Sequence, residues 1–241
     1  MTGSQLASPI VDDAIHDSRP DYLAAIIVAD RLRDEPPDRS SARELRAAAD
    51  EVRGLEVHHA SEHPHLAAWR TAFSELGIKA KRYPCSAEAL VARALKGKDL
   101  PSISALVDAY NAISLRYAVP IGGEDLDMIV GRPRIAIASG GESFAPTGSD
   151  EHERVPPGEV VRCDGAGVTC RRWNWRQGRR TRLTRRTRRA YFVLERLAPM
   201  AVDDLEVATD ELCESLLRRC PDAQLDVSYV GPFDRSSERS A

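Results

Sequence analysis

The chain has 241 residues, of which 42% are hydrophobic, 5% aromatic and 29% charged, a composition typical of folded globular proteins and unlike that of fibrous or disordered chains. Its 34 Lys and Arg against 37 Asp and Glu give a formal net charge of −3. No stretch approaches the roughly 18 uninterrupted apolar residues of a membrane span, and the N-terminus lacks a signal-peptide pattern. The cysteines form no C-x-x-C pair, which fits a reducing compartment. We therefore expect a cytoplasmic protein without a membrane partner.

Extended structure followed by a helix is predicted at the N-terminal end. The segments 9–16 and 22–32 are expected to be extended because apolar residues run through them over strand-like lengths. Residues 40–53 are rich in helix formers, and Ser41 and Glu44 have the spacing of a capping box. The sequence thus predicts a sheet that starts in this region and a helix after it.

Three further helices are predicted before residue 118. Pro64 suits the first position of a helix, and the apolar residues after it recur at helical spacing up to Gly77. A third helix should have Ser86 as its N-cap and end at Gly97, and a fourth should cover 102–117. The helices therefore gather in the first half of the chain.

From residue 120 the sequence changes to short β-favouring runs separated by Gly and Pro. No internal repeat and no long linker divides the chain. We expect one α+β domain over residues 1–233, with 234–241 as a loose tail. The predicted strands are 134–139, 159–164, 168–176, 190–197 and 224–231, with a helix over 201–220.

The charge is unevenly distributed along the chain. Residues 171–189 contain ten arginines and no acidic residue, which leaves a net charge of −13 on the other 222 residues. Such a segment suits a polyanionic partner such as nucleic acid. It is equally compatible with a solvated surface paired with the protein's own carboxylates. The sequence leaves both interpretations open.

Alternation along a strand would divide the side chains at the start of this arginine segment between two faces. Guanidinium groups bind phosphate in a bidentate manner and Trp can stack on a nucleobase, although core packing is the commoner use of Trp. Thr181 is a further candidate for a ligand contact, with a strand or turn role as the alternative. The predicted polar face holds Arg172, Asn174 and Arg176, and the other face holds Arg171, Trp173 and Trp175.

A second group of polar residues lies on the fourth predicted helix and in the loop after it. Asp108, Asn111 and Ser114 occur on this otherwise apolar helix, where a buried polar side chain needs a partner, either the adjoining loop or a ligand. Gly122 and Gly123 permit a close backbone approach, and their amides can bind a carboxylate or an oxyanion. This region is therefore a candidate ligand site.

Several common catalytic motifs are absent, namely the phosphate-binding loop, the dinucleotide fingerprint, H-E-x-x-H and G-x-S-x-G. We therefore expect no nucleotide cofactor. The histidines His58, His59, His63 and His65 lie close together in the sequence without a nearby Cys. We interpret them as part of a solvated loop and expect no metal site.

The order and spacing of these motifs resemble a known family. The resemblance is carried by ALVARALKGKDLPSISALVDAYNAISLRYAVPIGGEDLD, GEVVRCD, CRRWNWRQGRRTRLTRRT and AYFVLE, within about residues 60–200. These stretches are similar to the tRNA-editing (B3/B4) domain of the phenylalanyl-tRNA synthetase β-subunit, and more closely to free-standing relatives of that domain. The resemblance implies a three-layer α+β fold with a cleft. In the synthetase, that cleft hydrolyses tRNA charged with tyrosine in place of phenylalanine.

The resemblance also implies which residues lie beside the cleft. One departure from the synthetase domain is the segment 171–175, RRWNW, where that domain has a small Gly-rich turn, so a reshaped amino-acid pocket is expected. The chain has no recognisable ATP site or aminoacylation domain, and we expect no ligase activity. The implied residues are Asn111, Ser114, Gly122, Gly123 and Asp125 from the helix and loop motif, Arg172 and Asn174 from the strand motif, and Glu195 at the position of a side-chain-recognising glutamate.

The leading hypothesis is a hydrolase that cleaves the ester between a wrong amino acid and the 3′ end of a tRNA, without a cofactor. An aminoacyl ester is already activated, so a positioned water and a stabilised oxyanion can suffice. A non-catalytic RNA-binding module and a small-molecule amino-acid binder or enzyme are the alternatives, and the amino acid, the tRNA and the oligomeric state stay open. The catalytic candidates are Asn111, Ser114, Gly122, Gly123, Asp125 and Glu159, and the tRNA- or substrate-binding candidates are Arg171, Arg172, Asn174, Arg176, Thr181 and Glu195.

Overall fold

The computed structural model describes residues 9–148 and 151–231, so the tail predicted at 234–241 lies outside the described residues. The helices are α2 (Asp13–Ser18), α3 (Arg39–Arg53), α4 (Pro64–Glu75), α5 (Ser86–Leu95), α6 (Ala105–Tyr117) and α7 (Val202–Arg219), with the 3-10 turns η1 (Ala60–Glu62) and η2 (Leu126–Met128). The strands are β1 (Ile10–Val11), β2 (Leu23–Asp30), β3 (Ile121–Asp125), β4 (Arg134–Ile137), β5 (Ser143–Phe144), β6 (Glu153–Arg154), β7 (Val160–Asp164), β8 (Gly167–Arg171), β9 (Arg176–Gln177), β10 (Ala190–Arg196) and β11 (Gln224–Val230).

A four-stranded antiparallel sheet, in the order β11-β2-β10-β3, forms the centre of the molecule. Its inner strands β2 and β10 are almost wholly buried, as expected for strands covered on both faces. The register places Glu195 opposite Ala24 and Val193 opposite Gly122. Because side chains alternate along a strand, Gly122 and Glu124 lie on the same face of the sheet as Val193 and Glu195.

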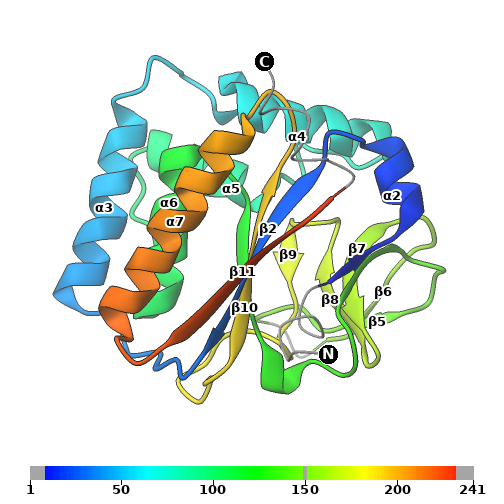
Figure 1. The fold of residues 1–241 in the computed structure, drawn as a ribbon. Coiled ribbons are helices and arrows are strands. Elements are labelled where there is room, and N and C mark those ends of the chain that lie inside the picture. The colour runs from blue at the N-terminus through cyan, green and yellow to red at the C-terminus, as the bar shows by residue number, and fades with distance from the viewer. Residues whose placement is uncertain (1–8, 149–150, 232–241) are drawn as a thin grey trace, which may run out of the picture.

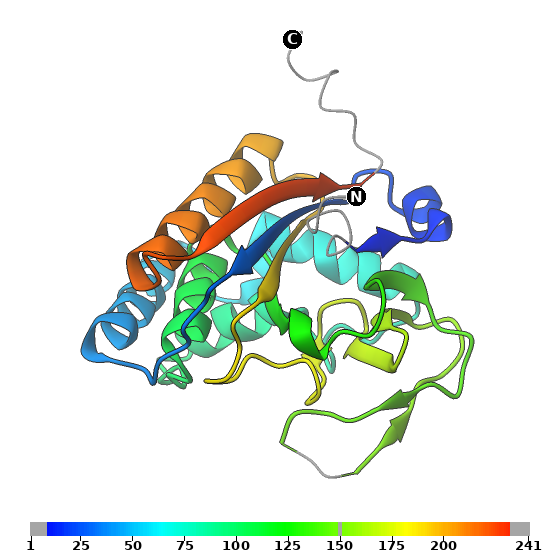
Figure 2. The same ribbon diagram turned by 60° about the horizontal axis from the view of Figure 1, so that its bottom comes forward.

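The predicted mixed α+β fold is observed, with a layer on each side of this sheet (Figures 1 and 2). On one face, Phe192 of β10 shares a core with Leu205 and Leu212 of α7 and with residues of α6. On the opposite face, Tyr191 of β10 shares a core with Val160 of the second sheet and with residues of α4. The second sheet has the strand order β1-β4-β7-β8-β9, and β5 and β6 form a separate hairpin. Within the described residues, one core therefore spans both sheets.

The N-terminal prediction needs a correction. Residues 9–16 were expected to be extended, but only Ile10 and Val11 form a strand, which pairs in parallel with β4. The chain then turns into α2, whose first turn carries Asp13 at the end where a helix favours negative charge. Ile15 is the one buried residue of this short helix. The helix places the Ile15 side chain in the core.

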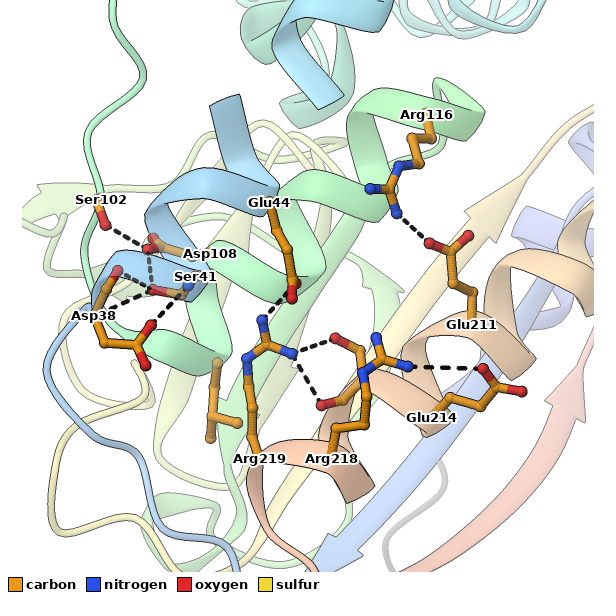
Figure 3. A network of polar contacts seen from close by, with 12 residues as sticks. Asp38, Ser41, Glu44, Ser102, Asp108, Arg116, Glu211, Glu214, Arg218 and Arg219 are labelled. Atoms are coloured by element: carbon orange, nitrogen blue, oxygen red, sulfur yellow. Dashed lines mark hydrogen bonds and ion pairs between the residues drawn. The ribbon is translucent and has the colours of Figure 1, made fainter. Parts of the chain in front are cut away.

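The start of α3 lies slightly earlier than the predicted capping box. Asp38 is the N-cap: its carboxylate accepts the N–H of Ser41 at 2.7 Å, and the Ser41 hydroxyl accepts the N–H of Asp38 at 3.2 Å. Glu44 points away from the cap and binds Arg219 of α7 at 2.5 Å (Figure 3). The reciprocal cap therefore exists, three residues earlier in the sequence than the predicted pair of Ser41 and Glu44.

The other predicted helices form as expected, with one change of cap. Pro64 occupies the first turn of α4, as predicted. In α5, Cys85 is the N-cap and its Sγ accepts the N–H of Glu88 at 3.4 Å, so the predicted cap, Ser86, is the first helical residue. The strands and the last helix predicted after residue 120 are confirmed to within a few residues, except at 168–176.

Asp108 fixes the start of α6 against neighbouring segments. Its carboxylate accepts the hydroxyl of Ser41 at 3.0 Å, the hydroxyl of Ser102 and the backbone N–H of Ile103 at 2.9 Å (Figure 3). Asp108 is fully buried, and these three donors satisfy it. The partner of Asp108 is therefore the adjoining chain and not a ligand.

Every helix within the described ranges is too short or too polar to cross a lipid bilayer.

Candidate functional site

A cavity of about 500 Å³ opens between α5, α6, the edge strand β3 and the turn that follows β8. Its helix side includes the apolar side chains of Leu90 and Val107, whereas its sheet side carries Glu124, Arg162 and Asn174. Ligand sites in proteins commonly measure about 300–1,000 Å³ and combine apolar walls with a few placed polar groups. The cavity has both properties, so it is the candidate functional site.

A buried ion pair underlies the sheet side of this cavity. Nη2 of Arg162 donates to Oε2 of Glu195 at 2.5 Å. Glu195 also accepts the Tyr22 hydroxyl at 2.9 Å, Nε1 of Trp173 at 3.1 Å and Nδ2 of Asn174 at 3.1 Å. Its exposed fraction is 0%. The carboxylate is thus saturated by four donors, and it holds Arg162 and Asn174 in place at the cavity.

Three buried polar atoms on the sheet side have no hydrogen-bond partner within the described residues. They are Oε1 of Glu124, Nε of Arg162 and Oδ1 of Asn174, and all three residues line the cavity. Their exposed fractions are only 1%, 5% and 4%. Buried polar atoms are nearly always paired in folded proteins, because an unpaired one costs about 1–3 kcal/mol. Three such atoms at one cavity therefore point to a polar ligand or bound water.

Glu124 is the carboxyl group with a perturbed environment in this cavity. Burial raises its pKa above the ordinary value for Glu, although the positive charge of Arg162 opposes this shift. The hydroxyl of Tyr191 donates to its Oε2 at 2.6 Å. A titratable group with a shifted pKa in a cavity is typical of functional sites.

The two adjacent glycines of β3 face opposite layers. A Cβ on Gly122 would lie 3.0 Å from Nη1 of Arg162, so the absence of a side chain lets the guanidinium lie across the strand. A Cβ on Gly123 would lie 2.9 Å from the ring of Phe192, in the opposite core. Gly122 therefore shapes the cavity, and Gly123 permits the packing behind it.

The backbone amides of these glycines also point in different directions. Glu195 donates its N–H to the carbonyl of Pro120 at 3.0 Å, and Asp125 donates its N–H away from β10 to Thr181 at 2.8 Å. Because hydrogen bonding alternates along an antiparallel strand, the N–H of Gly122 is directed toward β10 and that of Gly123 toward the outer edge. At that edge, Nε2 of Gln177 donates to the carbonyl of Gly123 at 2.7 Å.

Three of the predicted site residues line the cavity together: Asn111, Gly122 and Asn174. Asn111 lies on α6, the glycine on β3 and Asn174 in the turn after β8. The Asn111 side chain is partly exposed and, in the described part of the chain, forms no hydrogen bond. The structure thus brings these three residues to one cavity from elements that are distant in the sequence.

Several other predicted site residues bind neighbouring segments of the chain and do not line the cavity. Ser114 donates to the carbonyl of Val119 at 2.7 Å, which closes the end of α6. Asp125 is the N-cap of η2 and accepts the hydroxyl of Thr187 at 2.6 Å. Thr181 is fully buried and lines a smaller hollow of about 220 Å³ beside the hairpin β5-β6. Ser114 thus serves the end of α6, whereas Asp125 and Thr181 join the end of β3 to the loop beside it.

The strand predicted over 168–176 is interrupted, which corrects the predicted alternation of faces. Strand β8 ends at Arg171, and Arg172 and Trp173 adopt positive φ values of 48° and 64° in a turn that leads to β9. Trp173 enters the core, with its ring centroid 5.3 Å from that of Trp69. Trp175 remains partly exposed and lines the cavity. Burial of Trp173 forces the turn, so residues 171–176 do not share two faces.

The arginines beside this turn lie on the far side of the cavity wall. Arg171 forms a fork with Glu159 at 2.8 and 2.7 Å. The Arg172 guanidinium lies 3.8 Å from the Tyr83 ring centroid and 4.5 Å from that of Trp175. Arg172 and Glu159 line a second hollow of about 320 Å³. The stacked group of Tyr83, Arg172 and Trp175 therefore forms a wall between the two hollows.

Both interpretations of the arginine segment have support. Arg180 binds Asp164 at 2.6 Å, and Arg176 donates to the carbonyl of Thr147 at 3.2 Å. In contrast, the exposed side chains of Arg182, Arg185 and Arg186 form no ion pair or hydrogen bond within the described ranges. The start of the segment thus pairs with the protein itself, and its later part offers free guanidinium groups to a partner.

Sequence reasoning missed the two charged residues closest to the cavity floor, Glu124 and Arg162. Glu124 directly follows the glycine pair, and Arg162 is the one charged residue in the otherwise apolar run 160–163. Alternation places Arg162 on the same face of β7 as the buried Val160. A charged residue at an inward position of a strand is the signal that could have identified it.

The thiols near the cavity are poor nucleophiles. Burial raises the pKa of Cys170, which lines the cavity, to about 12, and that of Cys85 also to about 12, so neither forms a thiolate near neutral pH. Across residues 9–148 and 151–231, no three His, Cys, Asp or Glu side chains are grouped so as to hold a metal ion.

Comparison with known proteins identifies the family of this chain. A family model described as the B3/4 domain matches residues 68–214. The chain therefore belongs to the B3/4 domain family, which confirms the resemblance found in the sequence. No curated protein matches the chain. A crystal structure of an N-terminal fragment of the phenylalanyl-tRNA synthetase β-subunit from Pyrococcus horikoshii is similar, with 14% identity and a TM-score of 0.47 over 91% of this chain and 50% of that chain. This chain spans about half the length of that fragment.

Proposed function

We propose that this protein is an aminoacyl-tRNA hydrolase that removes the amino acid from a mischarged tRNA. The observation that carries the proposal is the cavity with an apolar helix side, a polar sheet side and three unpartnered buried atoms. Membership of the B3/4 domain family supports a role connected with tRNA. The protein would need no cofactor, because the reaction is the hydrolysis of an activated ester.

The chemistry requires an attacking water and a stabilised oxyanion. The water oxygen bonds to the ester carbonyl carbon, the bond from that carbon to the ribose oxygen breaks, and the ribose oxygen receives a proton. The unpartnered amide of Asn111 is suited to orient the ester or the water from the α6 side. We assign the oxyanion to the N–H of Gly123, which is directed to the outer edge of β3, where Gln177 of the cavity wall binds the Gly123 carbonyl.

The remaining predicted residues divide into two roles. Glu195 is a positioning residue, because it holds Arg162 and Asn174 without reaching the cavity surface. Glu159 and Arg171 position the turn at residues 172–175 through their fork. The free arginines of the segment, Arg182, Arg185 and Arg186, would contact the tRNA backbone, because phosphates favour exposed guanidinium groups. Arg182 lies directly beside the site, since its backbone pairs with that of Glu124.

The test is a panel of tRNAs, each charged with a correct or an incorrect amino acid, incubated with the purified chain. The half-life of each ester is compared with its half-life in buffer and with that in the presence of Asn111→Ala. Selective loss of one charged species with the wild-type protein supports the proposal. Salt-dependent tRNA binding without cleavage of any ester would instead indicate an RNA-binding module. If the protein neither binds tRNA nor cleaves any ester, a small-molecule binder is the remaining interpretation.

A further inference from the structure

The polar side of the cavity has an excess of negative charge and of hydrogen-bond acceptors. The positive charge of Arg162 is neutralised by Glu195 at 2.5 Å, and both groups are buried. Glu124 adds a second carboxylate at the same cavity, and its oxygen Oε2 receives only a neutral hydroxyl, from Tyr191. When Glu124 is ionised, the formal charge of Arg162, Glu195 and Glu124 together is −1. A ligand that carries positive charge is therefore favoured at this end.

The unpartnered atoms show the same preference. Two of them, Oε1 of Glu124 and Oδ1 of Asn174, accept hydrogen bonds, and one, Nε of Arg162, donates. Nδ2 of Asn174 donates to Glu195 at 3.1 Å, so the other atom of the same amide, which is turned to the cavity, is the oxygen. A carboxylate or phosphate would meet two acceptors and the Glu124 charge. An ammonium group, which has three donors and no acceptor, matches the two acceptors.

The opposite side of the cavity has a different preference. Leu90, Ile103 and Val107 line it, together with the ring of Tyr110. No acidic or basic side chain from α6 lines the cavity, and the one cation from α5, Arg93, is exposed and donates its Nε to the carbonyl of Asp99. An apolar side chain would bury its surface here, at a gain of about 25 cal/mol per Å².

We infer that Glu124, with Asn174, binds the protonated α-amino group of the aminoacyl ester, and that the α5 and α6 wall receives an apolar amino-acid side chain. This inference rests on the proposed function for its natural substrate. It makes Glu124 a binding residue that selects for a free α-amino group, so esters whose amino group is acylated are excluded. The substrate class is therefore a cationic aminoacyl ester with an apolar side chain.

Other charged and titratable groups act on Glu124 from the elements packed around it. Arg162 of β7 attracts a negative charge at Glu124, and Asp164 of the same strand repels it. From β10, the hydroxyl of Tyr191 donates to the carboxylate at 2.6 Å, and the nearby hydroxyl of Thr169 on β8 also lowers the pKa of Glu124. Burial is the largest effect and raises the pKa of Glu124. An ammonium ligand places a positive charge beside Glu124 and so favours the ionised form of its carboxyl group.

The binding test uses small probes, so that it does not depend on hydrolysis. Leucinamide and phenylalaninamide carry the α-ammonium and no carboxylate, and their N-acetyl derivatives are neutral. Binding of each to the full chain is measured by saturation-transfer NMR and by calorimetry. The wild-type protein should bind at least one amide about tenfold more tightly than its N-acetyl form, a difference of about 1.4 kcal/mol. Equal binding of the two forms would overturn the inference.

Variants identify the residue responsible. Glu124→Gln keeps the shape and removes the charge, and it should weaken amide binding about tenfold while leaving binding of the N-acetyl form unchanged. Glu88→Gln is the matched control, because Glu88 is also buried, also has one unpartnered oxygen, and does not line the cavity. It should leave both affinities unchanged. Unchanged amide binding by Glu124→Gln, or an equal loss with Glu88→Gln, would contradict the assignment.

The outcomes separate this inference from the proposed function. Failure of every ester in the tRNA panel to be cleaved, together with selective amide binding, would refute the hydrolase and retain the ammonium site. Equal cleavage of aminoacyl-tRNA and N-acetylaminoacyl-tRNA would support the hydrolase and refute the ammonium site. The N-acetyl comparison on the wild-type protein needs no variant, so it stands even where a substitution impairs folding.

Discussion

Arg162 and Glu195 form an ion pair of 2.5 Å beneath the candidate site, with side-chain exposures of 6% and 0%. The pair connects β7 of one sheet to β10 of the other. It also orients Asn174, whose Nδ2 donates to the same Glu195 oxygen. The position of the cavity floor therefore depends on a contact between the two sheets.

Removing one partner of this pair should strongly destabilise the protein. Glu195→Ala leaves the Arg162 charge buried without a counter-ion, which costs about 3–5 kcal/mol of unfolding free energy. Urea denaturation measures the change. Glu211→Ala is the control, because its pair with Arg116 is partly exposed, at 28% and 29% (Figure 3), and such pairs contribute about 0–1 kcal/mol. Similar losses for the two variants would show that the buried pair has no special role.

The two glycines of β3 should respond differently to alanine. Gly123→Ala introduces a Cβ 2.9 Å from the Phe192 ring and 3.0 Å from Leu183, an overpacking that costs about 1–3 kcal/mol of stability. Gly122→Ala meets Nη1 of Arg162 at 3.0 Å, so it should displace the guanidinium and weaken amide binding by about tenfold or more. Thermal unfolding and ligand titration distinguish the two effects. An identical profile for both variants would refute the assignment of opposite faces.

Asn111 should matter for activity and little for stability. Its side chain has no hydrogen-bond partner among the described residues, so Asn111→Ala should change the unfolding free energy by no more than about 0.5 kcal/mol. Deacylation of the selected tRNA should fall roughly 100-fold. Asp108→Ala, one turn earlier on α6, removes an acceptor of three hydrogen bonds and should cost about 3 kcal/mol. Full deacylation by folded Asn111→Ala would exclude it from the mechanism.

The free arginines should govern the salt dependence of tRNA binding. Arg185→Ala combined with Arg186→Ala removes two phosphate contacts, so the slope of log K against log salt should become less steep by about 2. Filter binding at several salt concentrations measures the slope. Arg43→Ala with Arg46→Ala is a control of equal charge on the exposed side of α3. An equal loss of slope in both double variants would indicate non-specific attraction.

Ionisation of the buried Glu124 should lower the unfolding free energy of the protein as the pH rises. Its folded-state pKa is raised by burial, so the folded state holds this proton more tightly than the unfolded state does. The cost is absent below the unfolded pKa of about 4.3 and grows as the pH rises through the folded pKa. Glu124→Gln should therefore have a higher melting temperature than the wild type at pH 8, by roughly 2–4 °C for each kcal/mol of this cost. The difference should vanish near pH 4. Thermal scans at both pH values test this, and an equal difference at both would contradict it.

The helices show how far local signals extend. Periodicity and proline placement predicted α3 to α7 to within a few residues, because these features act over one or two turns. The caps of α3 and α5 are Asp38 and Cys85 in place of the predicted Ser41 and Ser86. Each polar residue near a helix start competes for the same few backbone N–H groups, and local sequence does not rank these competitors.

The site shows where local signals end. Asn111, Gly122 and Asn174 could be selected as candidates from the sequence, and all three line the cavity. Glu124 and Arg162 were missed because their importance comes from burial and from partners on other strands. The turn at 172–175 was missed because burial of Trp173 overrides the strand pattern.

The sequence by itself determined the family, the helices, most strands and the concentration of positive charge, because these depend on residue type and short-range spacing. Only the tertiary structure decided which charges are neutralised and which remain available. Arg171, Arg180 and Glu195 find partners across distances of 12 residues or more along the chain. Burial and pairing are set by neighbours in space, and those neighbours exist only once the two sheets have packed together.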